Sequence, residues 1–144
     1  MIRRAEVDDI ERIIQMGMRF LRSHYAEVLD DPSAEAMSAT IAQIDSSPDG
    51  AIFVSEHGHD VSGFIAMMVY PHPFSGERLA GEVGWWVEPE SRGIDGMRLL
   101  RRAEEWARDK GAKKIVMVSP NARVDAFYER LGYRPIERAF GRNL

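Results

Sequence analysis

The sequence predicts a single α/β domain, in which strands and helices alternate around one mixed sheet. Three observations lead to this prediction. The chain has 144 residues, enough for one core and too few for two domains of ordinary size. Apolar runs of strand length alternate with segments whose apolar residues keep helical spacing. No repeat, low-complexity tract or linker interrupts the pattern, so we expect one domain over residues 1–144.

The chain opens with a short expected strand at residues 2–5. Aspartate at residues 8–9 is a good N-cap, and the following apolar residues keep helical spacing until about residues 24–25. Residues 30–33, Asp-Asp-Pro-Ser, provide a turn and a cap for a second amphipathic helix. Residues 46–50, Ser-Ser-Pro-Asp-Gly, end that helix with strong turn chemistry.

Three strands and a glycine-containing turn are expected next. Residues 51–55 and 61–70 flank a polar turn and predict a hairpin. The strand at residues 79–87 stops at Pro89, which has no N–H to give to a neighbouring strand. Residues 92–96, Arg-Gly-Ile-Asp-Gly, then turn the chain into a helix that continues to about residue 110. Outward-facing amides and the positive end of that helix predict an anion cradle with an arginine beside it.

The last third of the chain predicts a strand, a helix and a final strand. Residues 115–118 form a short apolar run typical of a buried strand. A helix should begin at Asn121, run through Arg130 and end at Gly132. Residues 136–140 are expected to form the last strand, whose exposed edge would allow pairing in a homodimer.

Composition excludes several classes of protein. The hydrophobic fraction of 44% and the charged fraction of 29% are those of a soluble globular chain. No apolar run approaches the length of a membrane span, and the start lacks the apolar segment of a signal peptide, so we expect a cytoplasmic protein without a membrane partner. The formal charge of −4 gives no support for nucleic-acid binding.

Metal and thiol chemistry are not expected either. The absence of cysteine excludes disulfides, thiolate metal sites and a cysteine nucleophile. His57 and His59 have too few companions for a metal site and are interpreted as part of a solvated turn. The expected partner is therefore a small molecule.

The segment Val87-Glu-Pro-Glu-Ser-Arg-Gly93, followed by a helix, resembles the acyl-coenzyme-A motif of GNAT-type N-acetyltransferases. In that family an Arg/Gln-x-x-Gly-x-Gly/Ala loop binds the pyrophosphate of coenzyme A. Counting from Arg92, the two glycine positions fall on Asp95 and Met97, which predicts a reshaped phosphate loop. The resemblance implies that the cofactor acetyl-CoA binds at Arg92, Gly93, Ile94, Asp95, Gly96 and Met97.

A second segment, Asn121-Ala-Arg-Val-Asp-Ala-Phe-Tyr-Glu-Arg-Leu-Gly-Tyr133, is similar to the GNAT pattern Asn-x-x-Ala-x-x-Phe-Tyr-x-Lys-x-Gly-Phe. The resemblance implies that Tyr128 is the general acid, which protonates the thiolate of coenzyme A as it leaves. The alternative is an aromatic core residue at the end of a helix. Asn121 either contacts the coenzyme arm or caps its own helix.

The resemblance also implies a general base, because an amine must be neutral to attack a thioester. Glu82, just inside the strand that leads to the cradle, is the candidate, and its alternative is an idle, solvated carboxylate. Glu56, Glu77 and His24 are weaker candidates for the same role.

Trp85 and Trp86 are neighbours on one strand and must face opposite sides of the sheet. One packs in the core, and the other lines the acceptor cleft; we assign Trp85 to the substrate, together with His24 and Tyr25. By resemblance, the backbone of Trp86 and Val87 pairs with the pantetheine arm, and one N–H polarises the thioester carbonyl. This arrangement requires the strand to separate from the one at residues 115–118.

The basic side chains of the two last helices have two interpretations. They reach the adenosine 3′-phosphate, or they pair with neighbouring glutamates on exposed helix faces. The arginines concerned are Arg98, Arg101, Arg102 and Arg123.

The resemblance implies a mixed, mostly antiparallel sheet of six to seven strands, flanked by about four helices. It implies an N-acetyltransferase that moves an acetyl group from acetyl-CoA to a primary amine of a small molecule by direct attack, without a metal. Two alternatives stay open. The acceptor is a protein N-terminus or lysine, or the chain is a non-catalytic, CoA-binding regulatory module.

Overall fold

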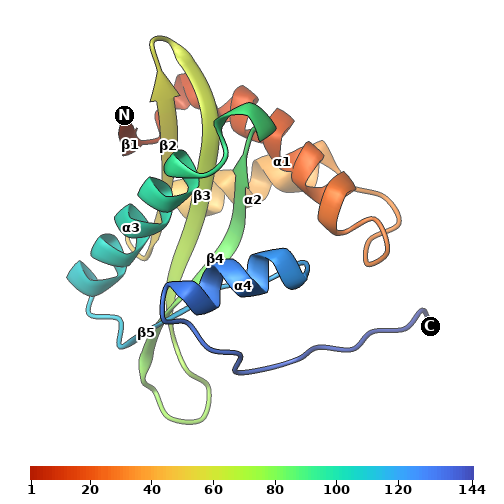
Figure 1. The fold of residues 1–144 in the computed structure, drawn as a ribbon, viewed down its shortest axis with the longest axis vertical. Helices are drawn as coiled ribbons and strands as arrows, with labels where there is room; N and C mark the ends of the chain where they lie inside the picture. The colour runs from red at the N-terminus through yellow and green to blue at the C-terminus, as the bar shows by residue number, and fades with distance from the viewer.

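A computed structural model describes residues 1–144 as one sheet covered by helices on both faces (Figure 1). The five strands lie in the order in which they occur along the chain: β1 Ile2–Arg4, β2 Gly50–His57, β3 Asp60–Pro71, β4 Arg78–Val87 and β5 Lys114–Val116. The α-helices are α1 Ile10–His24, α2 Ala34–Ser46, α3 Ile94–Asp109 and α4 Ala122–Arg130. Two 3₁₀ turns, η1 Val7–Asp9 and η2 Pro89–Ser91, precede α1 and α3.

Two of the expected helix caps are formed. The Ser33 hydroxyl accepts a hydrogen bond from the Ala36 amide, and the Asn121 side-chain oxygen accepts bonds from two amides of the first turn of α4. Asp9 precedes α1 as expected but does not cap it, because its carboxylate is bonded to the Arg3 guanidinium and to the Glu6 amide. No helix is both long enough and apolar enough to cross a bilayer.

The sheet separates two apolar clusters, because successive side chains of a strand face opposite sides. Phe53, Ile65 and Met67 face α3, and their cluster includes Leu99 and Trp106 from that helix. The opposite cluster packs beneath α1 and α2 and is made of residues with the alternate phase: Ile52, Val54, Phe64, Ala66 and Trp86 from the strands, and Ile13, Met16, Ile41 and Ile44 from the helices.

The sheet opens on one side of β4. Strands β4 and β5 are parallel and pair only from Leu79 and Lys114 to Gly81 and Val116. Beyond that point β4 continues alongside β3 to Val87, while the β5 chain turns away toward α4. The β3–β4 register also shifts at this point, where Val83 is the additional residue. The separation of neighbouring strands that the site requires is therefore present.

The sheet has five strands and not six to seven, since the expected last strand at residues 136–140 is not formed. Residues 134–144 are an exposed tail that leaves the body of the domain after Gly132 (Figure 1). β5 pairs over only three residues, which is a short template for another strand. The tail also carries four charged residues: Arg134, Glu137, Arg138 and Arg142. The expected edge at residues 136–140 is thus absent.

Candidate active site

Glu82 and Tyr128 meet at one residue, Val118, in the opening between β4 and β5. The Val118 amide donates a hydrogen bond to the Glu82 carboxylate at 3.1 Å. The Tyr128 hydroxyl, on α4, donates a longer one to the Val118 carbonyl at 3.4 Å. A carboxylate and a phenol that the sequence separates by 46 positions are therefore brought to the two sides of one peptide segment.

The surroundings suit these groups to opposite proton-transfer roles. Burial raises the pKa of Glu82 to about 7, although the Val118 amide opposes the shift. Burial, together with the negative charge of Glu82 and the proximity of Tyr133, raises the pKa of Tyr128 well above its usual value. Near neutral pH the carboxyl group can therefore accept a proton, whereas the phenol carries one that it can donate.

The two tryptophans of β4 face opposite sides, as expected, but Trp85 is not beside His24. Trp85 packs toward α3 and α4, with its ring centroid 6.1 Å from those of Phe127 and Tyr128. Trp86 faces α1, and its ring lies 5.9 Å from His24. The register of β4 on β3 decides this, because Trp86 pairs with Phe64 on the face that α1 and α2 cover.

The end of α1 places an aromatic cluster against Trp86. The Phe20 ring lies 5.6 Å from His24 and 5.2 Å from Tyr25. The pKa of Tyr25 is raised by burial and by the charge of Glu82, while that of His24 is lowered by burial and by the charge of Arg92. His24 and Tyr25 thus lie on the α1 side of β4, close enough to the opening for the charge of Glu82 to act on Tyr25.

Glu88, which the sequence did not single out, holds this region together. Its carboxylate is buried directly after β4 and accepts hydrogen bonds from Arg12 and Arg19 on α1. The Trp86 indole N–H donates to its other oxygen at 3.3 Å. A buried carboxylate needs such partners, so Glu88 ties α1 and the Trp86 ring to the strand end.

The start of α3 lies where the anion cradle is expected. Gly93 has a φ of 100°, a backbone conformation that residues other than glycine rarely adopt. At this residue the chain turns into the helix. The first helical bond runs from the Met97 amide to the Gly93 carbonyl. The amides of Ile94, Asp95 and Gly96 therefore have no acceptor within the helix and, with the helix dipole, can bind an anion.

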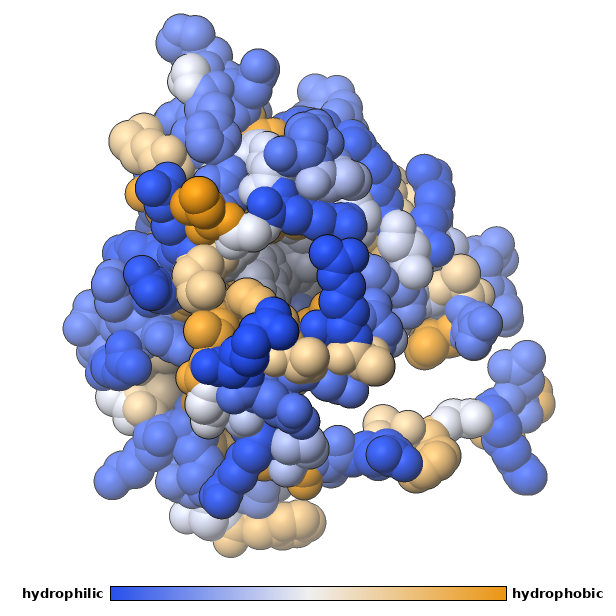
Figure 2. Space-filling model, in the orientation of Figure 1, coloured by the Kyte–Doolittle hydropathy of each residue, from blue (hydrophilic) through white to orange (hydrophobic).

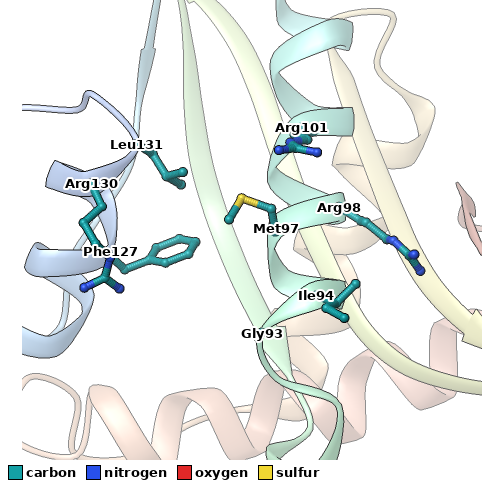
Figure 3. A pocket seen from close by; sticks show the side chains of 8 residues that line it. All are labelled: Gly93, Ile94, Met97, Arg98, Arg101, Phe127, Arg130 and Leu131. Carbon is teal, nitrogen blue, oxygen red and sulfur yellow. The ribbon is translucent and has the colours of Figure 1, made fainter.

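A cleft of about 730 Å³ runs from this cradle to α4 (Figure 3). Met97 from α3 and Phe127 and Leu131 from α4 point toward one another across it. Its other lining residues are Gly93, Ile94, Arg98, Arg101 and Arg130, and none of the three arginines has an ion-pair partner. In Figure 2 the same face of the molecule is hollowed between α3, α4 and α1.

These features fit an acyl-coenzyme A. The cradle and the unpaired arginines provide donors and positive charge for phosphates, and the apolar cleft wall suits a ring or an alkyl chain. The Trp85 ring lies close to Gly96, and its indole N–H is buried without an acceptor. No group of three or more His, Cys, Asp or Glu residues is arranged to hold a metal ion.

Arg92 lies at the strand end rather than on the cleft. Its Nε donates to the Val87 carbonyl at 3.1 Å, and its guanidinium lies 4.9 Å from the centre of the Trp86 ring. It lines a second cavity of about 390 Å³ on the other side of the first turn of α3, together with His57, Glu90, Ser91, Ile94, Asp95 and Arg98.

The structure also gives the positions of Asn121, of the arginines on the last two helices and of His57. Asn121 serves as the cap of α4, which is the second of its two interpretations. Arg102 packs on the Phe53 ring and approaches Glu105, and neither it nor Arg123 lines the cleft. Arg130, absent from the expected set, does line it. His57 lies at an exposed hairpin turn, as expected, and in addition its Nε2 is 2.6 Å from a buried carboxylate oxygen of Asp95, a contact that the sequence did not indicate.

Comparisons with known proteins agree with this geometry. A model of the acetyltransferase (GNAT) family matches residues 16–133. A search of curated protein sequences finds no significant match. Among solved structures, an acetyltransferase from Trypanosoma brucei is 24% identical, with a TM-score of 0.76 and coverage of 100% of this chain and 99% of that one.

Two further solved structures are similar. AAC(6')-Iy, in complex with the bisubstrate analogue CoA-S-monomethyl-acetylneamine, is 18% identical, with a TM-score of 0.77 over 100% of this chain and 97% of that one. An aminoglycoside acetyltransferase from an uncultured soil metagenomic sample, in complex with trehalose, is 16% identical, with a TM-score of 0.72 over 100% and 95%. At these identities the likeness concerns the fold.

Proposed function

The chain belongs to the acetyltransferase (GNAT) family, and we propose that it transfers an acetyl group from acetyl-CoA to a primary amine of a small molecule. As a member of this family it is an acyl-CoA-dependent acetyltransferase. The observation that carries the proposed reaction is the convergence of Glu82 and Tyr128 on Val118, at the opening between β4 and β5.

The proposed reaction is a direct attack. Acetyl-CoA, when bound, supplies the acetyl thioester. Glu82 takes a proton from the amine, whose nitrogen forms a bond to the carbonyl carbon as the carbon–sulfur bond breaks. A backbone N–H at Trp86 or Val87 stabilises the negative charge that develops on the carbonyl oxygen. Tyr128 gives its hydroxyl proton to the departing sulfur, and all atoms and charges balance.

The cofactor residues follow from the cradle and the cleft. The amides of Ile94, Asp95 and Gly96 would hold the pyrophosphate, in the manner of the motif that the sequence resembles. Arg98, Arg101 and Arg130 would hold the remaining phosphate, because they line the cleft with no other partner. Arg92 would contact the cofactor at the end of β4, where its guanidinium lies against the Val87 carbonyl.

The acceptor is assigned to the α1 side of the opening. Trp86, His24, Tyr25 and Phe20 form a compact aromatic group there, and the Glu82 charge acts on Tyr25. Aromatic rings close to a carboxylate suit the binding of a small organic amine. The proposal therefore moves the acceptor contact from Trp85 to Trp86.

The test is acetyl transfer to two panels of amines, measured as release of the coenzyme A thiol. One panel holds small primary amines, and the other holds peptides with free N-termini or lysines. Turnover with small amines alone supports the proposal, whereas turnover with peptides alone replaces it with a protein acetyltransferase.

A second candidate function rests on the substitution in the phosphate loop. Asp95 occupies a position where the resembled motif has glycine, and the negative charge of its carboxylate, next to the cradle amides, opposes anion binding. A non-catalytic CoA-binding module is then the alternative. Calorimetric binding of acetyl-CoA and desulfo-CoA, with no thiol release from any amine, would favour it.

A further inference from the structure

Asp95 introduces a negative charge where the proposed cofactor needs positive charge. It lies in the first turn of α3 and is only 4% exposed. The N-cap of the helix is Gly93, which makes no side-chain cap, and the Asp95 carboxylate bonds to His57 and Ser62 instead of to the helix start. Its carboxylate must therefore be compensated elsewhere, because a buried charge without partners is strongly unfavourable.

The compensation comes from the β2–β3 hairpin. Asp95 Oδ2 is 2.6 Å from His57 Nε2, on the last residue of β2, and accepts a hydrogen bond from the Ser62 hydroxyl of β3 at 3.3 Å. One carboxylate oxygen thus ties the first turn of α3 to both strands of the hairpin. The hydrogen bond from His57 holds the pKa of Asp95 below its usual value despite the burial of the carboxylate.

The pair lies at the edge of the cradle. His57 and Asp95 line the second cavity together with Arg98, and Arg98 also lines the large cleft. The Asp95 amide belongs to the cradle, while its side chain is held on the hairpin side. A neighbour that holds this side chain also determines where the amides of the first turn point.

We propose that His57 is a positioning residue for the acyl-coenzyme A: it holds the Asp95 carboxylate against the hairpin, keeps the cradle amides free for phosphate and screens the Asp95 charge. This role rests on the proposed use of the cradle for the cofactor. It predicts that the two residues are energetically coupled: the effect of a His57 substitution on acetyl-CoA affinity depends on the presence of the Asp95 carboxylate.

The experiment is a double-mutant cycle with the full chain, read by calorimetry with acetyl-CoA and by steady-state kinetics. His57→Ala should weaken acetyl-CoA binding about tenfold, the size expected for loss of one charge-assisted hydrogen bond. The KM for acetyl-CoA should rise by the same factor, with kcat and the amine KM unchanged. His57→Gln, which keeps a donor, should restore most of the affinity.

In the Asp95→Asn background, His57→Ala should change the affinity less than twofold, because the charge to be screened is gone. His59→Ala is the matched control, since His59 lies at the same hairpin turn and its side chain does not bond to Asp95. An equal loss on both backgrounds, or no loss in His57→Ala, would overturn the role of His57 alone. Failure of the wild-type chain to bind acetyl-CoA would instead overturn the proposed function and this inference with it.

Discussion

Glu82 and Tyr128 hydrogen-bond to the same residue, one to the amide of Val118 and the other to its carbonyl. Val118 lies two residues beyond the last paired residue of β5, so both bonds are made where the sheet has opened. These two bonds place a proton acceptor and a proton donor at the amide and the carbonyl of a single residue. The first predictions concern these two groups.

Glu82→Gln should abolish the acid limb of the pH–rate profile. With a pKa of about 7, the wild-type carboxyl is protonated and inactive below that pH, so kcat/KM should rise through pH 7. The variant has no such group and should be slower by roughly 10²- to 10⁴-fold, the usual contribution of general acid–base catalysis. An unchanged profile in Glu82→Gln would place the base elsewhere.

Tyr128→Phe should lower kcat without a matching loss of stability. The hydroxyl is the proposed proton donor, and its only hydrogen bond, to Val118, is long at 3.4 Å. Removing it should cost at most about 1 kcal/mol in the free energy of unfolding, measured by urea denaturation. Tyr133→Phe is the control, because it removes a hydroxyl bonded to Glu104 from a neighbouring ring. Equal turnover in the wild type and Tyr128→Phe would reject the general-acid role.

Gly93→Ala should weaken acetyl-CoA binding through the backbone. Its φ of 100° costs an alanine roughly 1–3 kcal/mol, and relief of that strain would move the amides of the cradle. Gly76→Ala is a matched control, because Gly76 has a positive φ and open space around it but lies in the β3–β4 loop. Both variants should melt at lower temperature, and only Gly93→Ala should lose affinity in calorimetry.

Arg130→Ala should reduce the affinity for acetyl-CoA, whereas Arg123→Ala should not. Both arginines lie on α4, but only Arg130 lines the cleft. Loss of one phosphate contact by an arginine is worth about tenfold or more. The difference in affinity between the two variants should shrink when dephospho-coenzyme A replaces coenzyme A, because the dephospho form lacks the 3′-phosphate that Arg130 is proposed to contact.

Glu88→Gln should destabilise the fold and disturb the acceptor side. The neutral side chain can still accept from Trp86 but loses its charge toward Arg12 and Arg19, which is worth about 1–3 kcal/mol. We expect a lower midpoint in urea and a higher KM for the amine, with an unchanged KM for acetyl-CoA. Glu90→Gln, an exposed neighbour, should change neither quantity.

Local chemistry made much of this protein predictable from its sequence. Ser33 and Asn121 start helices because their side chains bond to amides two or three residues away, and no distant partner is needed. The turn at Gly93 and the start of α3 follow from the same kind of short-range signal. The family resemblance likewise rests on two continuous segments, and the family match spans both.

Contacts between distant segments could not be predicted. The His57–Asp95 pair joins positions 38 apart, and the last strand failed to form because β5 offered too short an edge. The alternation of a strand requires Trp85 and Trp86 to face opposite sides, and the sequence determined this by itself. Only the register of β4 on β3, and the helices that cover each face, decided that Trp86 meets His24 and Trp85 meets Tyr128. Strand register depends on packing across the whole sheet, and so it belongs to the tertiary structure.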